Sequence, residues 1–167
     1  MFLNEIKISN KVNNILIKNC GFTLLELLIV CAIISTLVAI SIPKYQEYIN
    51  KVKIKVAIVE IREIEKIIYD FLNDKKYLPN NLTEAGANWL DPWGVPYGYI
   101  LIQGMPEKGK EKVQPRKDRS LHPINTDFDL FSNGPDRQSK LPLTAQVSQD
   151  DIIRAENGRF IGQAKDF

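Results

Sequence analysis

The sequence predicts an α+β protein, in which one long N-terminal helix precedes a smaller domain with at least two β-strands. An apolar run from Phe22 to Ile42 is followed directly by an amphipathic stretch with helical spacing, so one helix is expected to extend through both. Further along, residues 97–102 and Phe128 to Ser132 have the apolar and aromatic composition of strands and are bounded by turn residues.

The apolar run is long enough to span a membrane. It has 21 residues with Glu26 as its only charge, and a helix of that length extends roughly 30 Å, about the thickness of a bilayer core. A soluble core helix, the alternative, would normally keep a polar stripe. The preceding segment is basic, with Lys7, Lys11 and Lys18 against a single acid, which predicts a single pass with the N-terminus in the cytoplasm.

Glu26 is an unusual residue for such a segment. An acid in the middle of a membrane helix costs about 2.5 to 3.5 kcal/mol on insertion scales, so it normally has a partner and a function. No Lys or Arg lies within residues 22–42. Glu26 therefore needs a cation from outside the segment.

The residues around Glu26 form a recognisable motif. The stretch GFTLLELL, which starts at Gly21, resembles the prepilin cleavage motif of type IV pilins and type II secretion pseudopilins. In that family the prepilin peptidase cuts after the glycine, so the resemblance implies cleavage between Gly21 and Phe22 and N-methylation of Phe22. Glu26 matches the glutamate thought to pair with the N-terminal amine of a neighbouring subunit during filament assembly. A signal anchor that keeps its leader is the alternative.

An amphipathic helix is expected from Lys44 to Asn73. Pro43 need not end the helix before it and is expected to leave a kink. Apolar residues then recur at three- and four-residue steps, at Tyr45, Ile49, Val52, Val56, Ile61, Ile64, Ile68 and Phe71. The stripe changes face near Val56, which argues against a long coiled-coil stalk.

Together with these elements, the resemblance implies four segments. They are a cleaved cytoplasmic leader (1–21), a transmembrane and filament-core helix (22–43), its amphipathic continuation (44–73) and a periplasmic β domain (74–167). A charged loop at about 104–121, which includes Arg116, is expected to be solvated and mobile, because charge clusters without apolar residues seldom fold.

Composition excludes several classes of function. Of 22 basic and 20 acidic residues the leader holds three and one, which leaves 19 of each and no bulk attraction for nucleic acid. Cys20 lies in the leader and Cys31 in the apolar run, so the exported part has no disulfide. His122 is the only histidine, and no nucleophile or phosphate-binding motif accompanies it, so no enzymatic activity is expected.

The C-terminal half resembles one branch of the family. DPWGVPYGYI from Asp91 and DFDLFSNGPD from Asp127 are similar to the major pseudopilin family, protein G, of type II secretion systems. In that family a short antiparallel sheet packs on the long helix, the pilin-like fold. The resemblance implies an inner-membrane precursor that assembles with copies of itself, minor pseudopilins and an assembly platform into a periplasmic pseudopilus that drives protein export. A type IV pilin for adhesion, motility or DNA uptake is the alternative.

Calcium is the cofactor that the resemblance implies, in the loop after the second strand. The candidate ligands are the side chains of Asp136, Asp150 and Asp151 together with the carbonyl of Asn133, and such oxygen ligands suit calcium. Residues 137–149 depart from the family pattern, because they lack Gly and Asp and bring in positive charge.

A short helix is the alternative for the same acidic residues. Ser148 would be its N-cap, Asp150 and Asp151 would lie in its first turn, and it would end before Gly158.

Overall fold

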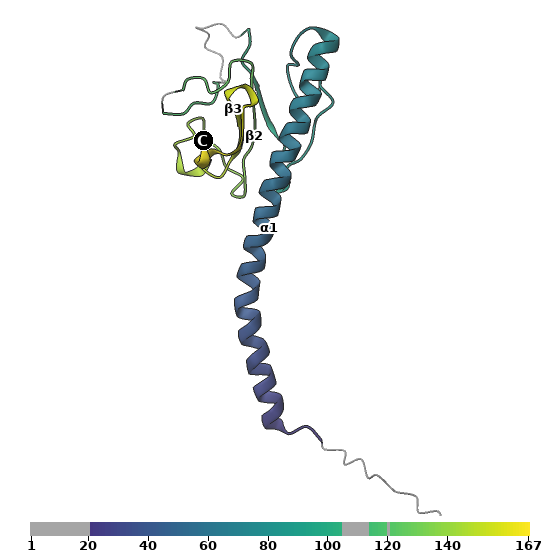
Figure 1. The fold of residues 1–167 in the computed structure, drawn as a ribbon, viewed down its shortest axis with the longest axis vertical. Helices are drawn as coiled ribbons and strands as arrows, with labels where there is room; N and C mark the ends of the chain where they lie inside the picture. The colour runs from purple at the N-terminus through teal and green to yellow at the C-terminus, as the bar shows by residue number, and fades with distance from the viewer. Residues whose placement is uncertain (1–20, 105–113, 120) are drawn as a thin grey trace, which may run out of the picture. The chain divides into compact units, whose positions relative to one another are not determined.

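The computed structural model describes residues 21–104, 114–119 and 121–167 (Figure 1). Most of the leader and most of the charged loop at about 104–121 lie outside the described residues. The elements in chain order are helix α1 (Leu24–Lys75), strands β1 (Gly98–Leu101) and β2 (Phe128–Ser132), 3-10 turn η1 (Gln146–Ser148), strand β3 (Ile152–Ala155), 3-10 turn η2 (Glu156–Gly158), strand β4 (Phe160–Gln163) and 3-10 turn η3 (Ala164–Asp166).

Helix α1 covers both of the expected helical segments in 52 residues. It continues through Pro43, so the prediction that this proline does not end the helix is confirmed, while the kink stays a prediction. Lys76 follows the last helical residue with a positive φ of 69°, the left-handed conformation in which many helices end. Contacts within the chain divide it between Ile42 and Pro43 into two compact units.

The second unit contains an antiparallel sheet with the order β1-β2-β3-β4. Gly98 lies opposite Phe131 in the register of β1 and β2, and a Cβ at Gly98 would clash with the Phe131 ring. A glycine is therefore required at this position of β1. One long helix with a small antiparallel sheet confirms the predicted α+β, pilin-like fold.

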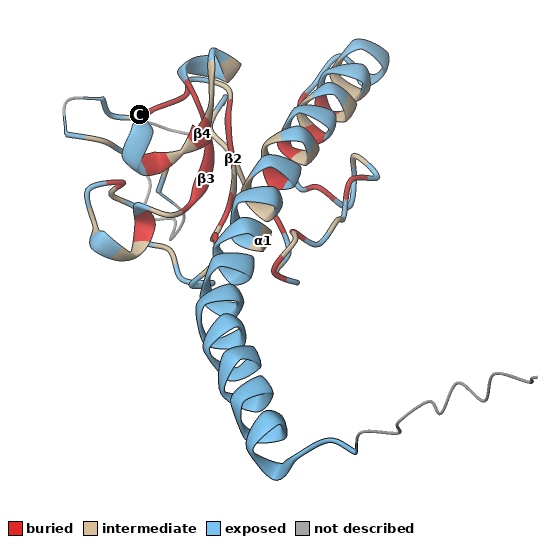
Figure 2. Cartoon of the chain, turned by 60° about the horizontal axis from the view of Figure 1, so that its bottom comes forward, coloured by how far each residue is buried: buried red, intermediate tan, exposed pale blue. Residues whose placement is uncertain are grey.

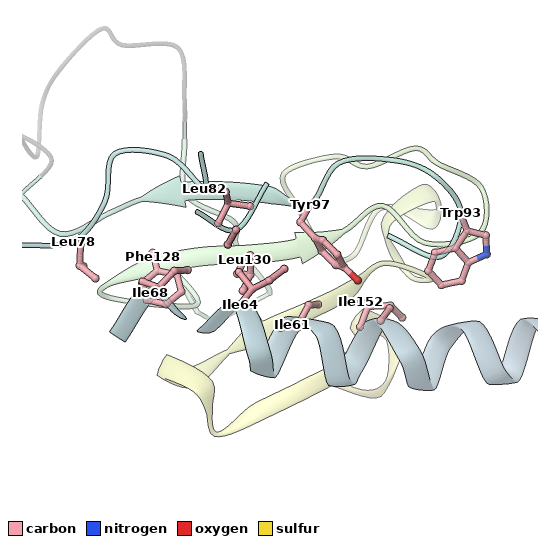
Figure 3. Close-up of a cluster of buried hydrophobic side chains, with 12 residues drawn as sticks. Ile61, Ile64, Ile68, Leu78, Leu82, Trp93, Tyr97, Phe128, Leu130 and Ile152 are labelled. Carbon is pink, nitrogen blue, oxygen red and sulfur yellow. The ribbon is translucent and has the colours of Figure 1, made fainter. Parts of the chain in front are cut away.

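The main core lies between the C-terminal part of α1 and the sheet. Ile61, Ile64 and Ile68 are fully buried and pack with Phe128 of β2 and Ile152 of β3 (Figure 3). Their spacing of three and four residues puts them on one face of the helix, and other faces of α1 stay exposed (Figure 2). Truncating one such isoleucine to alanine typically costs 2 to 5 kcal/mol, so this stripe fixes the sheet to the helix.

A tight turn joins two segments that are far apart in sequence. The Asp91 carboxylate accepts hydrogen bonds from the amides of Trp93 and Val95 through Oδ1. Its Oδ2 accepts a hydrogen bond of 2.5 Å from the Ser132 hydroxyl at the end of β2. The buried Asp91 thus ties the DPWG turn to the second strand.

The expected short helix near Ser148 is wrong. Asp150 and Asp151 lead into strand β3, and Ser148 is the last residue of the η1 turn. The sequence of β3 lacks the alternation of apolar and polar residues that is typical of a strand, because β3 is buried on both faces. Ile152 packs in the main core and Ile153 in a second cluster with Ile124, Leu143, Ala155 and Ala164.

Candidate functional site

The expected cleavage site lies just before helix α1. Gly21 and Phe22 precede the first helical residue, and both are exposed, Phe22 at 77%. The peptide bond between them is therefore accessible to a peptidase.

Glu26 takes part in a capping box at the start of α1. The Thr23 hydroxyl accepts a hydrogen bond from the Glu26 amide at 3.2 Å, and Glu26 Oε2 accepts hydrogen bonds from the amide and the hydroxyl of Thr23, both at 2.9 Å. This reciprocal pattern satisfies backbone donors that a helix N-terminus leaves free. The T-x-x-E spacing from Thr23 to Glu26 is the signal in the sequence for this capping box.

The helix beyond this cap exposes an apolar surface. Every residue from Leu24 to Ile42 is exposed, including Leu24 at 81% and Ile40 at 67%. Within the described part of the chain, α1 is the one helix long and apolar enough to cross a membrane. Such a surface requires lipid or protein around it.

The three aspartates expected to bind calcium do not converge. Asp136 and Asp150 line a cavity of about 440 Å³ together with Lys165, and Asp150 Oδ2 accepts a hydrogen bond from the Asp136 amide at 3.2 Å. Asp136 is exposed, and its Oδ1 accepts a hydrogen bond from the Gln138 amide. No group of three or more His, Cys, Asp or Glu side chains in the described ranges could hold a metal ion.

Asp151 is engaged by a cation from the protein itself. Its fully buried carboxylate pairs with Arg116 at 2.5 Å and accepts a hydrogen bond from the Ser139 hydroxyl at 2.6 Å, both on Oδ2. Oδ1 is buried without a hydrogen-bond partner in the described chain, so Asp151 offers one free oxygen where calcium takes six to eight. Burial raises the pKa of Asp151 to about 6, against the effect of Ser139 and Arg116.

The residues therefore do not fit the implied calcium ion. A guanidinium beside Asp151 and an ammonium beside Asp136 and Asp150 both repel a cation. Calcium binding stays a prediction of the family resemblance, and this arrangement gives it no support.

The burial of Arg116 corrects the interpretation of its loop. The sequence suggested a solvated charge, but the Arg116 side chain is 2% exposed. A run of mixed charges carries no signal that one of them is buried, because the partner, Asp151, lies 35 residues away.

Comparison with known proteins agrees with the fold and the helix. A family model described as the prokaryotic N-terminal methylation motif matches residues 16–42. A fimbrial protein of Neisseria meningitidis is 35% identical over 67 residues, and the type IV major pilin protein PilE1 of Neisseria gonorrhoeae is 39% identical over 68 residues. Each match covers 40% of this chain, and the chain spans only about two fifths of the length of these relatives, 39% and 41%.

A longer match extends into the C-terminal unit. A probable minor fimbrial protein of Dichelobacter nodosus is 36% identical over 136 residues, which cover 81% of this chain and 76% of that protein. No solved structure matches the chain. On the strength of this match, the methylation motif and the fold, the chain belongs to the type IV pilin-like family of fimbrial proteins.

Proposed function

We propose that this chain is a filament subunit, made as a single-pass inner-membrane precursor and assembled through its N-terminal helix after maturation. The prepilin peptidase cuts between Gly21 and Phe22, and Phe22 becomes the methylated N-terminus. The observation that carries the proposal is the exposed apolar surface of residues 24–42, because lipid covers it in the precursor and neighbouring helices cover it in a filament.

Glu26 has the capacity to bind a neighbour. Both hydrogen bonds that its carboxylate accepts from Thr23 end on Oε2. Within the described residues Oε1 makes no hydrogen bond, so it is available to the α-amino group of Phe22 in another copy. An amine and a carboxylate attract strongly in a low-dielectric core, and each offsets part of the desolvation cost of the other.

A second exposed apolar stripe supports contacts between copies outside the membrane. It consists of residues at three- and four-residue steps along α1, namely Tyr45, Tyr48, Val52, Val56 and Val59, all at least 39% exposed. The buried stripe that begins at Ala57 faces the sheet, so this one remains available. Because it follows the apolar segment directly in sequence, we propose that the helices of other copies cover it.

The filament that we favour is the periplasmic pseudopilus of a type II secretion system, with an inner-membrane assembly platform as partner. Two features support it. The segments that resemble the major pseudopilin are bonded to each other through Asp91 and Ser132, and the chain after Cys31 has no cysteine for a disulfide-bonded loop. A surface type IV pilus is the second candidate, and the fimbrial names of the relatives favour it.

Deleting the gene in the native cell distinguishes a pseudopilus from a surface pilus. For a pseudopilus we expect proteins normally found outside the cell to accumulate in the periplasm, while surface filaments in the sheared fraction are unchanged, and a wild-type copy restores export. Loss of surface filaments with normal export would overturn the pseudopilus in favour of the pilus. If neither changes, the filament proposal itself is wrong.

A further inference from the structure

Arg116 is a buried cation that strand β2 holds in place. Its amide donates a hydrogen bond to Oδ2 of Asp129 at 2.6 Å. Its guanidinium carbon lies 4.3 Å from the centroid of the Phe131 ring, within the range of a cation–π contact. Since Asp129 and Phe131 both belong to β2, the backbone and the side chain of Arg116 are anchored to the same strand.

The guanidinium reaches both ends of one stretch of the β2–β3 loop. Nη2 donates to Oδ2 of Asp151 at 2.5 Å, and Nη1 donates to the Ser139 hydroxyl at 2.8 Å. The Ser139 hydroxyl donates in turn to the same Asp151 oxygen at 2.6 Å, and Nη2 also contacts the Lys140 carbonyl. One cation thus joins residues 139 and 140 to residue 151.

Apart from this network, backbone hydrogen bonds hold the loop, from the Lys117 amide to the Leu141 carbonyl, from the Leu143 amide to the Lys117 carbonyl and from the Lys165 amide to the Gln149 carbonyl. Between Asn133 and Asp151 only Leu143 is a buried large apolar side chain, and no cysteine is present. Ser148 Oγ bonds both the amide and the carbonyl of Lys140, which closes the loop next to the Arg116 contacts. The guanidinium is therefore central to the polar network of the loop.

We propose that the buried guanidinium of Arg116 takes the place of a structural metal ion in this loop, so that residues 133–151 keep their fold in the absence of calcium. The proposal goes beyond the filament function and does not rest on it. It also accounts for the failure of the three aspartates to converge, because the one that is fully buried, Asp151, already has its cation.

A guanidinium is well suited to this place. It is planar, always charged, and carries five donors in a fixed fork, so it bonds several oxygens at once as a metal ion does. Lysine offers one compact charge and would not bond Ser139 and Asp151 in the same geometry. Charge alone is therefore insufficient, which gives the proposal a specific test.

The experiment uses the full chain in detergent micelles and follows its thermal unfolding by circular dichroism and intrinsic fluorescence. For the wild type, millimolar calcium chloride and an excess of chelator are expected to give the same midpoint. Arg116→Ala is expected to lower the midpoint by about 10 °C or more, and Arg116→Lys to recover only part of the loss. Arg119→Ala, a change of an exposed arginine in the same segment, is the matched control and should leave the midpoint unchanged.

Three outcomes would overturn the proposal. The first is a wild-type midpoint that rises by several degrees with calcium or falls with chelator, since a bound metal would then hold the loop. The second is an Arg116→Ala midpoint equal to that of Arg119→Ala. The third is full recovery in Arg116→Lys. If Arg116→Ala does not fold at all, the calcium series on the wild type and the lysine variant still decide.

Discussion

Replacing Arg154 with methionine is expected to lower the free energy of unfolding of the C-terminal unit by about 3 to 5 kcal/mol. Arg154 is fully buried in β3, and its Nε donates to Oε1 of Glu65 on α1 at 2.6 Å. Its Nη2 donates to Oδ2 of Asp127 at 2.8 Å and to the Tyr69 hydroxyl at 2.9 Å. Removing this cation leaves two mostly buried carboxylates, of Glu65 and Asp127, without a counter-charge.

Denaturant unfolding of the full chain in detergent micelles measures this loss. Arg159→Met is the control, because Arg159 is exposed and close in sequence. A combined variant, Arg154→Met with Glu65→Gln and Asp127→Asn, should recover a large part of the loss, since it removes the uncompensated charges together with the cation. A loss in Arg154→Met no larger than in Arg159→Met would contradict the structural role of the network.

Arg154→Met should also reverse the direction in which Asp127 makes stability depend on pH. Burial alone would raise the pKa of Asp127, but hydrogen bonds from Arg154 and the Phe128 amide outweigh it and lower the pKa. In the wild type, ionised Asp127 therefore stabilises the folded state at neutral pH. This stabilisation is lost as the pH falls through the folded-state pKa of Asp127, below about pH 4.

In Arg154→Met the desolvation of Asp127 remains without the compensating guanidinium, so its pKa rises. The variant should then gain stability relative to the wild type as the pH falls from about 7 to about 4. Asp151, with its raised pKa, contributes equally to both proteins. The difference between the two stability curves therefore isolates Arg154, and a flat difference would contradict the assignment.

Glu26→Gln is expected to reduce filament assembly at least tenfold while leaving cleavage after Gly21 intact. Glutamine at this position keeps the capping box with Thr23, so the substitution removes the charge and little else. A buried amine without its counter-charge typically costs 3 to 5 kcal/mol, and each 1.4 kcal/mol is a factor of ten. Filaments in sheared or envelope fractions, quantified by immunoblot against total protein, give the measurement.

Thr23→Val tests the contribution of the helix cap while Glu26 keeps its charge. It removes the hydroxyl that bonds Glu26, and an N-cap loss of this kind costs about 1 kcal/mol, so a much smaller defect is expected. Glu156→Gln, the same change at an exposed glutamate of the C-terminal unit, should have no effect. Normal assembly of Glu26→Gln would show that assembly does not need the charge of Glu26.

Much of the fold was predictable because its signals are local. The apolar run and the three- and four-residue spacing define α1, and the expected strand Phe128–Ser132 has the observed bounds. The change of face near Val56 corresponds to the start of the buried stripe of α1, whose first buried residue is Ala57. Each of these features depends on residues close together in the chain.

The features that could not be predicted from the sequence depend on contacts between residues far apart in the chain. The sequence does not distinguish strand β3 from the alternative short helix, because burial on both faces removes the alternation of apolar and polar residues that is typical of a strand. Arg154 bonds Glu65 across 89 residues and Arg116 bonds Asp151 across 35, and nothing in the neighbouring sequence distinguishes these arginines from solvated ones. The predicted calcium ligands failed to converge for the same reason, since Asp151 is paired with a distant cation.

The central claim is that this chain is matured at its N-terminus into a filament subunit. Its most direct test is the intact mass and N-terminal sequence of the protein from membranes of cells with and without prepilin peptidase. We expect a chain that begins at methylated Phe22 when the peptidase is active, and an uncut chain when it is absent. A chain that still begins at Met1 with the peptidase active would contradict it and leave a membrane-anchored domain that keeps its leader.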